Sequence, residues 1–486
     1  MSESALKDKT VRGVGWSAAD AFLGQGVSFV VGLVLARLLS PEEYGLIGIV
    51  TIFTTILFGF VDCGFGNSLI RKQDANDDDY NTMFVVNLVM SILMYALLFF
   101  GAPTIATFFN RPQLVSLVRV SGLLLIIQAL SIVQYTILSK NVDFKTKTKV
   151  SLISAIISGV IGVAMAFSGF GVWSLVGQML LKQLIYTVGL WGYIHWLPSF
   201  KFSLYSFRYM WGFGWKLMLS GLLDRLWNQL YQVVVGKFYS PSSLGQYTRA
   251  SEYASIFSGN LSSIVQRVSY PVLSLVQDDQ ERMVRGYRKV IKTTMFVTAI
   301  IMISMGAVAE PLIYCLIGPQ WLEAATYLPL ICISMSLYPL HSINLNMLQI
   351  QNRTDIFLIL EIIKKTIAVG PICLGIFINV YWMLGGSIIT GFIAFFLNSY
   401  YTGKRLGYSS LMQLKDIAPS YGIALLIALS VFFFKFLPFS YWIILPIQIF
   451  VGVCVFFLVC EKTQMEEYLE VKGLAKQYLM KLNRNK

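Results

Sequence analysis

Fourteen apolar stretches of about 20 residues divide the chain, and this pattern constrains the fold more than any other feature. A helix of about 20 residues crosses a ~30 Å hydrocarbon core, where helices and closed barrels alone satisfy their backbone hydrogen bonds. Of the 486 residues 56% are apolar and 13% charged, which leaves little chain for a soluble domain. We therefore expect an all-α polytopic membrane protein with about 14 transmembrane helices, near 13–38, 44–66, 83–103, 113–138, 150–168, 172–195, 211–236, 244–275, 290–317, 323–350, 356–377, 382–403, 417–437 and 441–460.

The net charge of +13 is placed as in a membrane protein, which argues against nucleic acid as a partner. Alternate loops between the stretches hold 27 of the 38 Lys and Arg residues, whereas the intervening loops hold four, namely Arg37, Arg111, Lys237 and Lys435. Basic residues collect in cytoplasmic loops. The bias predicts a multi-pass protein of the plasma membrane with both termini in the cytoplasm. The segment Met1–Arg12 is polar, and the apolar stretch after it is long and is followed by further spans. We therefore expect no cleaved signal peptide.

An internal repeat with an offset of about 200 residues relates the two halves. GVGW at 13–16 matches GFGW at 212–215, and SPEEYG at 40–45 matches SPSSLG at 240–245. Parallel repeats related by an axis along the membrane normal are a transporter architecture. We expect an N-terminal lobe with helices 1–6 (1–196), a C-terminal lobe with helices 7–12 (197–404), and helices 13–14 with a cytoplasmic amphipathic tail (405–486). An interfacial linker helix is expected at 199–211, where apolar and polar residues occupy different helical faces.

Polar side chains inside the stretches are the candidate functional residues, because a charge at mid-bilayer costs about 2.5–3.5 kcal/mol on the insertion scale. Arg225, Asn228, Gln229 and Gln232 follow at i, i+3, i+4 and i+7 and form one polar stripe on a helix. Such a stripe fits the wall of a wet cavity. The alternative is that Asp224 or another carboxylate neutralises Arg225 inside the helix bundle.

Other intramembrane charges have a structural explanation beside the functional one. Arg249 and Glu252 are spaced i, i+3 and are expected to pair, as is Glu361 with Lys364 or Lys365. Asp20 stands alone in the first stretch, which makes it a candidate proton or sodium site unless it pairs with Arg225 or Lys182. The candidates for ion coupling are Asp20, Asp224 and Glu252.

Signs of catalysis, cofactors or a metal centre are absent from the sequence. It has two histidines, no nucleotide-binding or hydrolase motif, and six single cysteines within apolar runs. His341 and Asn344 share a helical face and suit either sugar hydroxyls or an interhelical hydrogen bond. Asp77, Asp78 and Asp79 could hold a divalent cation, but a solvated acidic loop is the preferred interpretation. We expect no enzyme, no cofactor and no metal.

Several short motifs occur along the chain, namely Trp16, ARLLSPEEYG (36–45), DCGFGNSLIRK (62–72), VQRVSYPVLSLVQDD (265–279) and GPQW (318–321). Together they resemble the motifs of the Wzx-type flippases of lipid-linked oligosaccharides. These proteins form the polysaccharide transport branch of the multidrug/oligosaccharidyl-lipid/polysaccharide exporter superfamily, and the likeness is closest to exporters of the colanic-acid and teichuronic-acid kind. The resemblance covers about residues 5–460.

The resemblance implies two six-helix lobes that form a V, a bacterial inner-membrane location, and alternating access of a central cavity. It implies an undecaprenyl-diphosphate-linked oligosaccharide as cargo, moved to the outer leaflet for O-antigen, capsule or exopolysaccharide synthesis. Uphill transport would need a Na⁺ or H⁺ gradient, whereas removal of product by polysaccharide polymerase machinery would itself give a direction. The cationic residues that fit a cargo-binding role are Arg225, Lys182, Arg119 and Arg249, with Arg267 and Lys216 nearer the cytoplasmic mouth.

Three other classes of function compete with this interpretation. A cation-coupled multidrug exporter of the same superfamily would favour an acidic cavity, whereas the spans carry slightly more basic than acidic residues. A membrane polysaccharide polymerase or acyltransferase would be expected to have a larger external loop or a cluster rich in His and Asp. A purely structural scaffold would have little use for polar stripes within its spans.

Overall fold

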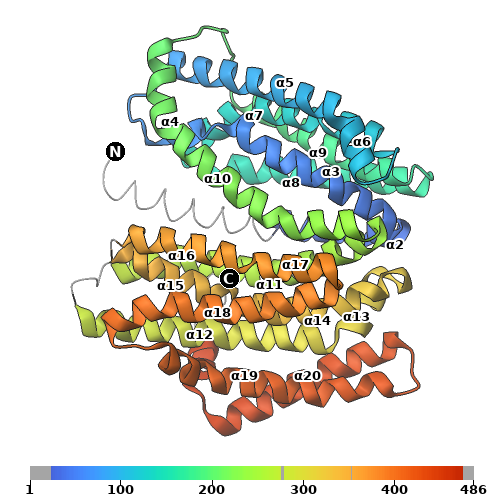
Figure 1. Ribbon diagram of the computed structural model, residues 1–486, viewed down its shortest axis with the longest axis vertical. Coiled ribbons are helices and arrows are strands. Elements are labelled where there is room, and N and C mark those ends of the chain that lie inside the picture. The colour runs from blue at the N-terminus through green and yellow to red at the C-terminus, as the bar shows by residue number, and fades with distance from the viewer. Residues whose placement is uncertain (1–22, 275–278, 352, 474–486) are drawn as a thin grey trace, which may run out of the picture. The chain divides into compact units, whose positions relative to one another are not determined.

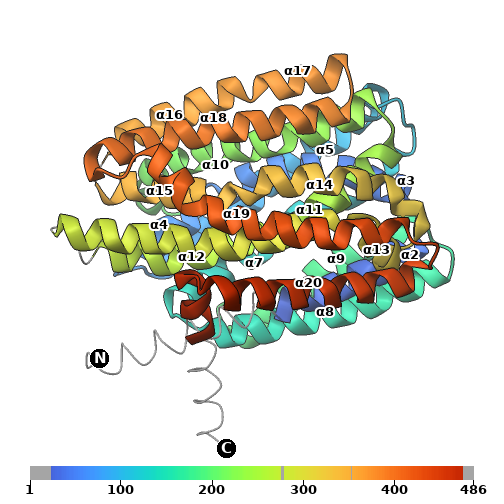
Figure 2. The ribbon, with the colours of Figure 1, turned by 90° about the horizontal axis from the view of Figure 1, so that it is seen from below.

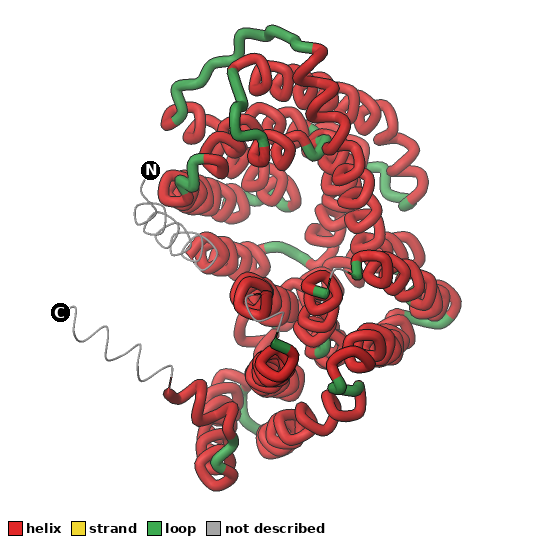
Figure 3. The backbone as a smooth tube through the Cα atoms, turned by 90° about the vertical axis from the view of Figure 1, so that its left-hand side faces the viewer, coloured by secondary structure: helices red, strands yellow, loops and turns green. Residues whose placement is uncertain are grey.

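The structure, a computed structural model, describes residues 23–274, 279–351 and 353–473, and over these residues it contains helices and loops but no strand (Figure 3). The chain packs as two compact units, the first ending at Gly245 and the second beginning at Gln246. The lobe boundaries expected from the sequence repeat, at 196/197 and 404/405, remain a prediction.

The first unit is built around α3, which packs on α5, α7, α9 and α10. Its side chains Ile49, Val50 and Ile52 are almost fully buried. The helices of this unit are shown in Figure 1, and they are α2 (Gln25–Leu38), α3 (Pro41–Asp62), α4 (Phe65–Arg71), α5 (Asp77–Phe108), α6 (Leu114–Ser121), α7 (Leu123–Lys140), α8 (Phe144–Phe167), α9 (Val172–Tyr193) and α10 (Leu204–Phe238).

The second unit contains most of α11, and its core surrounds α12, which packs on α14, α15 and α19. The helices α19 and α20 lie side by side in Figure 2. Its elements are α11 (Pro241–Ser274), α12 (Gln280–Ala307), α13 (Ala309–Ile317), η2 (Pro319–Trp321), α14 (Leu322–Ser336), α15 (Tyr338–Ile350), α16 (Thr354–Ile367), α17 (Val369–Phe377), α18 (Val380–Leu406), α19 (Ser410–Phe432), η3 (Phe433–Phe436) and α20 (Tyr441–Thr463).

Every one of the fourteen predicted stretches overlaps a helix or a pair of consecutive helices. Nine helical stretches of the described residues are long and apolar enough to cross a membrane, so the protein is a multi-pass membrane protein. The count of fourteen crossings stays a prediction. Three long helices, α9, α10 and α11, do not reach that hydropathy, and they carry Lys182, Arg225 and Arg249.

The two Ser-Pro motifs of the repeat have the same local structure. Ser40 caps α3 by accepting a hydrogen bond from the Glu43 amide, and Ser240 accepts one from the Ser243 amide at 3.0 Å where α11 begins. The glycines of both motifs are needed for close packing. A Cβ on Gly45 would overlap the carbonyl of Pro241, and a Cβ on Gly245 would overlap the carbonyl of Pro41. The two helix starts therefore touch backbone to backbone, in a reciprocal manner that matches the repeat.

The structure corrects the expectation of a separate linker helix at 199–211. Residues 194–203 are not helical, and α10 begins at Leu204 and continues unbroken to Phe238. Ser203 caps this helix by accepting a hydrogen bond from the Ser206 amide. Phe207 and Trp211 stack at 5.8 Å and both contact the ring of Phe65 edge to face. The apolar face expected for a membrane surface thus packs in part on α4.

Candidate functional site

A cavity of about 720 Å³, lined mostly by residues with polar side chains, lies within the first unit between α3, α7, α8, α9 and α10. Its volume falls in the range of small-molecule sites, roughly 300–1,000 Å³. Two cations, Lys182 and Arg225, contribute to its wall, and none of the described residues that line it is acidic. The lining residues are Thr51, Thr54, Thr55, Phe58, Leu124, Gln128, Ser151, Ser154, Gln178, Met179, Lys182, Gln183, Tyr186 and Arg225.

Arg225 enters the cavity from α10 with part of its hydrogen-bonding capacity unused. Its Cζ lies 5.5 Å from the centre of the Phe58 ring, and its Nη1 is buried without a hydrogen-bond partner among the described residues. Asp62, about one turn further along α3, lies close enough for its charge to attract Arg225, although no ion pair joins the two in the described structure. A buried, unpaired guanidinium nitrogen is costly unless a ligand or water completes it.

Lys182, on α9, also lines the cavity. Its Nζ donates a hydrogen bond of 3.1 Å to the hydroxyl of Ser28 on α2. A neutral hydroxyl does not compensate the positive charge of the ammonium group, and no carboxylate pairs with Lys182 among the described residues. In this part of the structure the charge is available to an anion.

Neutral amides and hydroxyls make up most of the remaining polar wall, and sequence reasoning did not single them out. Gln183 donates to the hydroxyls of Ser131 and Thr187, both at 3.3 Å, while Thr54 donates to the carbonyl of Val50 at 3.2 Å. Such groups can both donate and accept, as sugar hydroxyls do. The arrangement suits a ligand with a negatively charged group and several hydroxyls.

The rest of the stripe on α10 does not line this cavity. Asn228 is exposed, and Gln229 and Gln232 are partly buried. The Oε1 atom of Gln229 is buried with no hydrogen-bond partner among the described residues. Asp224 and Lys216, on the same helix, are exposed.

Arg119 has a local partner in a neighbouring helix. Its Nε donates a 3.3 Å hydrogen bond to the carbonyl of Phe99, and its Cζ lies 4.3 Å from the centre of that ring. Pro103, four residues after Phe99 in α5, has no amide hydrogen to donate to that carbonyl. Arg119 therefore replaces a hydrogen bond that the proline removes from the helix.

The predicted residues of the second unit whose side chains are described are bonded to each other or to neighbouring helices. Arg249 forms an ion pair of 2.8 Å with Glu252, and Lys364 pairs with Glu361. His341 Nδ1 lies 3.4 Å from the amide nitrogen of Asn398. Asp20 lies outside the described residues, as does the side chain of Arg267.

Asn344 is fully buried at the centre of a hydrogen-bond network. Its Oδ1 accepts from the Tyr287 hydroxyl at 2.8 Å and from the Gln413 amide at 3.2 Å, and its Nδ2 donates to Gln413 at 3.0 Å. The network joins α12, α15 and α19. Asn344 thus makes the interhelical hydrogen bonds that the sequence analysis gave as the alternative to a contact with sugar hydroxyls.

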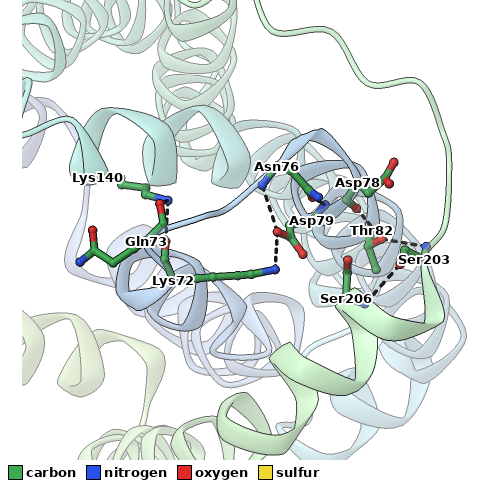
Figure 4. Close-up of polar contacts among 9 residues, drawn as sticks. All are labelled: Lys72, Gln73, Asn76, Asp78, Asp79, Thr82, Lys140, Ser203 and Ser206. Carbon is green, nitrogen blue, oxygen red and sulfur yellow. Dashed lines mark hydrogen bonds and ion pairs between the residues drawn. The ribbon is translucent and has the colours of Figure 1, made fainter.

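The three successive aspartates do not form a solvated loop. They open α5, where Asp79 and Asn76 form a capping box, and Asp79 is fully buried while Asp77 and Asp78 are exposed. Asp79 accepts a 2.8 Å hydrogen bond from Lys72 (Figure 4). The Nζ of Lys72 also lies 5.0 Å from the centre of the Tyr209 ring of α10. Partial burial lowers the pKa of Lys72, but the hydrogen bond and charge of Asp79 outweigh it and raise that pKa above the ordinary value.

This cluster also holds the chain segment that leads into α10. The hydroxyl of Thr82 accepts a 3.0 Å hydrogen bond from the Ser203 amide, and Asn81 accepts one of 2.7 Å from the Ser199 amide (Figure 4 shows the former). Lys140 donates to the carbonyl of Lys72 at 2.6 Å. The cluster is thus an anchor for the start of α10, and the sequence did not reveal it because its members come from four separate segments.

The fold of this chain is known from solved structures of other proteins. The chain is similar to a solved structure described as "Lipid II flippase MurJ, inward closed conformation", with a TM-score of 0.68 and 15% sequence identity over 94% of this chain and 100% of that one. At this identity the match establishes the fold alone.

The family follows from the sequence comparisons, and it confirms the resemblance seen in the motifs. Residues 34–326 match the family described as "Polysaccharide biosynthesis protein", and the chain belongs to this family. The succinoglycan biosynthesis transport protein ExoT of Rhizobium meliloti (strain 1021) is 31% identical over 327 residues, which span 67% of this chain and 66% of that protein. The teichuronic acid biosynthesis protein TuaB of Bacillus subtilis (strain 168) is 27% identical over 63% of each chain. The matched part thus spans just under two thirds of these relatives.

Proposed function

We propose that the protein is a flippase that carries an undecaprenyl-diphosphate-linked oligosaccharide from the cytoplasmic to the outer leaflet by alternating access. The observation that carries the proposal is the cavity of the first unit, which combines Lys182 and Arg225 with a neutral polar wall. The protein performs transport rather than catalysis, and its product serves the synthesis of a surface polysaccharide.

The chemistry of the cargo explains why two cations are needed. A lipid diphosphate carries about two negative charges, and moving it through hydrocarbon without compensation is prohibitive. A guanidinium binds phosphate oxygens through paired, charge-assisted hydrogen bonds, while an ammonium acts as a point charge. Arg225 and Lys182 would receive the diphosphate, and the neighbouring amides and hydroxyls would contact the sugars. The prenyl chain would stay in the lipid.

The orientation of the chain is part of the proposal. Both termini lie in the cytoplasm, the two repeats form two lobes, and the membrane is the bacterial inner membrane. The distribution of basic residues between alternate loops supports this topology. Single cysteines introduced at Lys145 and Lys435 test it: an impermeant thiol reagent should label position 435, and not 145, in intact cells. The opposite labelling would contradict the topology.

Leaflet exchange in proteoliposomes tests the function directly. The purified protein is reconstituted with a labelled polyprenyl-diphosphate oligosaccharide, and a membrane-impermeant glycosidase reports which sugars have reached the outside. Protein-dependent loss of protection is expected. Continued protection with several such lipids, from folded protein both with and without an imposed Na⁺ or H⁺ gradient, would contradict the proposal and favour a drug exporter, which a cation-efflux assay would then examine.

A further inference from the structure

Gly214 brings α10 into backbone contact with the turn that separates α3 from α4. This turn consists of Cys63 and Gly64, both in the left-handed region with φ of 49° and 68°. A Cβ on Gly214 would lie 2.7 Å from the carbonyl oxygen of Cys63 and 2.9 Å from Cδ1 of Phe65. In the other direction, a Cβ on Gly64 would lie 2.7 Å from the carbonyl oxygen of Gly214. A residue with a side chain at position 214 must therefore move α10 away from the turn.

Gly214 and the cavity-lining residue Arg225 lie on the same face of α10. Arg225 follows 11 residues later, which is about three helical turns or 16 Å along the axis, so the two residues point in nearly the same direction. There the guanidinium lies against Gly59 of α3, where an added Cβ would be 3.3 Å from Nη1 and 3.4 Å from Leu222. The position of α10 against α3 thus decides where the guanidinium lies.

We propose that Gly214 is a positioning residue for Arg225. Its missing side chain sets the distance and register of α10 on the α3–α4 turn, and this register places the guanidinium in the cavity. The anchor at the start of the helix, made by Lys72, Asp79 and Thr82, holds the preceding turns, so that a displacement at Gly214 is passed on toward Arg225. The inference rests on the proposed function only for the identity of the anion that the cavity binds.

The same helix offers two matched controls. Gly212 and Gly221 are also in α10, and a Cβ added to either would meet no atom within 4 Å. Replacement by alanine gives the same gain in helix propensity at all three positions. A difference between Gly214→Ala and the other two variants therefore reports the contact with the turn.

The first measurement does not depend on the cargo. In full-length protein whose six native cysteines are replaced, Arg225→Cys supplies a single thiol in the cavity wall, and a charged, water-soluble thiol reagent reports its accessibility. Gly214→Ala should change the labelling rate by on the order of tenfold, whereas Gly212→Ala and Gly221→Ala should leave it within about twofold. Equal rates in all three variants would overturn the inference, whether or not the protein is a flippase.

The second measurement uses inorganic pyrophosphate as a probe of the cavity in protein that retains Arg225. Titration calorimetry should show binding that Gly214→Ala weakens about tenfold and the two controls leave unchanged, because one charge-assisted hydrogen bond is misplaced. Absence of pyrophosphate binding in the unaltered protein would count against the proposed function, while the labelling experiment would still decide the role of Gly214.

Folding of the altered protein is followed by size-exclusion chromatography and thermal unfolding. Should Gly214→Ala fail to fold, the pair Gly214→Ala with Phe65→Leu relieves the clash with the ring and leaves the overlap with the Cys63 carbonyl, and the same changes in labelling and binding are expected. If both fail while Gly212→Ala and Gly221→Ala fold, the contact serves folding as a whole, which would overturn the specific positioning of Arg225.

Discussion

Two polar residues within the helices, Arg225 in the first unit and Asn344 in the second, are used differently. In the first unit, Arg225 and Lys182 line a cavity, and Arg225 has a buried nitrogen without a hydrogen-bond partner among the described residues. In the second unit, Asn344 is fully buried and makes hydrogen bonds through both its amide oxygen and its amide nitrogen. Residue type alone does not separate the two uses. The difference lies in whether the neighbouring helices supply the partners, and a group that the protein leaves incomplete is the better candidate for binding cargo.

Replacing Arg225 should have the largest effect, and that effect should be on transport. Arg225→Ala removes paired hydrogen bonds to a diphosphate, so leaflet exchange should fall by on the order of 100-fold, or about 2.7 kcal/mol. The free energy of unfolding should fall by less than this, because the guanidinium is not bonded to other side chains in the described structure and only its charge attracts Asp62. Arg225→Lys keeps the charge but not the planar fork, and it should give an intermediate rate. If both variants exchanged lipid at the wild-type rate, Arg225 would not bind cargo, and its contrast with Asn344 would be wrong.

Replacing Asn344 should lower the stability of the protein and leave transport unchanged. Asn344→Leu leaves the hydroxyl of Tyr287 and the amide of Gln413 buried without their partner. Hydrogen bonds inside membrane proteins contribute on average ~0.6 kcal/mol each, and unsatisfied groups add to the loss, so the free energy of unfolding in micelles should fall by about 2 kcal/mol. Exchange per folded molecule should be unchanged. A transport defect without a loss of stability would instead place Asn344 in the cargo pathway.

Lys182 provides a finer test of the cavity. Lys182→Met keeps the length of the side chain and removes its charge, and among the described residues it costs the protein the hydrogen bond to Ser28. Exchange should fall about tenfold, less than for Arg225 because an ammonium makes a single point contact. Ser28→Ala, which keeps the charge and removes its hydrogen-bond acceptor, is the matched control and should stay within about twofold of wild type. A larger defect in Ser28→Ala than in Lys182→Met would mean that the hydrogen bond matters more than the charge.

The presence of the helices could be predicted from the sequence, because hydropathy over about 20 residues is a strong local signal. It also identified Lys182 and Arg225 individually, since a charge in an apolar stretch stands out. It could not show that both line one cavity, because hydropathy does not tell which faces of the consecutive helices α9 and α10 border the same space. The neutral lining residues gave no signal at all: Thr54 lies in the wall, yet it also bonds the carbonyl of Val50 as any helical threonine can.

The anchor at the start of α10 was misjudged for the same physical reason. Three successive aspartates suggest a solvated loop, and the burial of Asp79 depends on Lys72, which precedes it by seven residues, and on the rings of α10. A continuous α10 was also not expected, since the amphipathic pattern at 199–211 is equally typical of a separate surface helix. Packing on Phe65 and the cap at Ser203 decide between the two.

Removing the ion pair between Arg249 and Glu252 should have the smallest effect of these changes. It tests whether a cation that is paired within the protein can also bind cargo. The pair is made within α11 itself. The Arg249 side chain is 13% exposed, but the Glu252 side chain is 48% exposed, so water screens the carboxylate end of the pair. Glu252→Gln should change the free energy of unfolding by about 0.5 kcal/mol or less and leave exchange within about twofold. The double replacement Arg249→Gln with Glu252→Gln should behave likewise. If Arg249→Gln alone lowers exchange tenfold or more while the protein remains stable, then a paired cation also contacts the cargo, and completeness of local hydrogen bonding would no longer separate the binding residues from the structural ones.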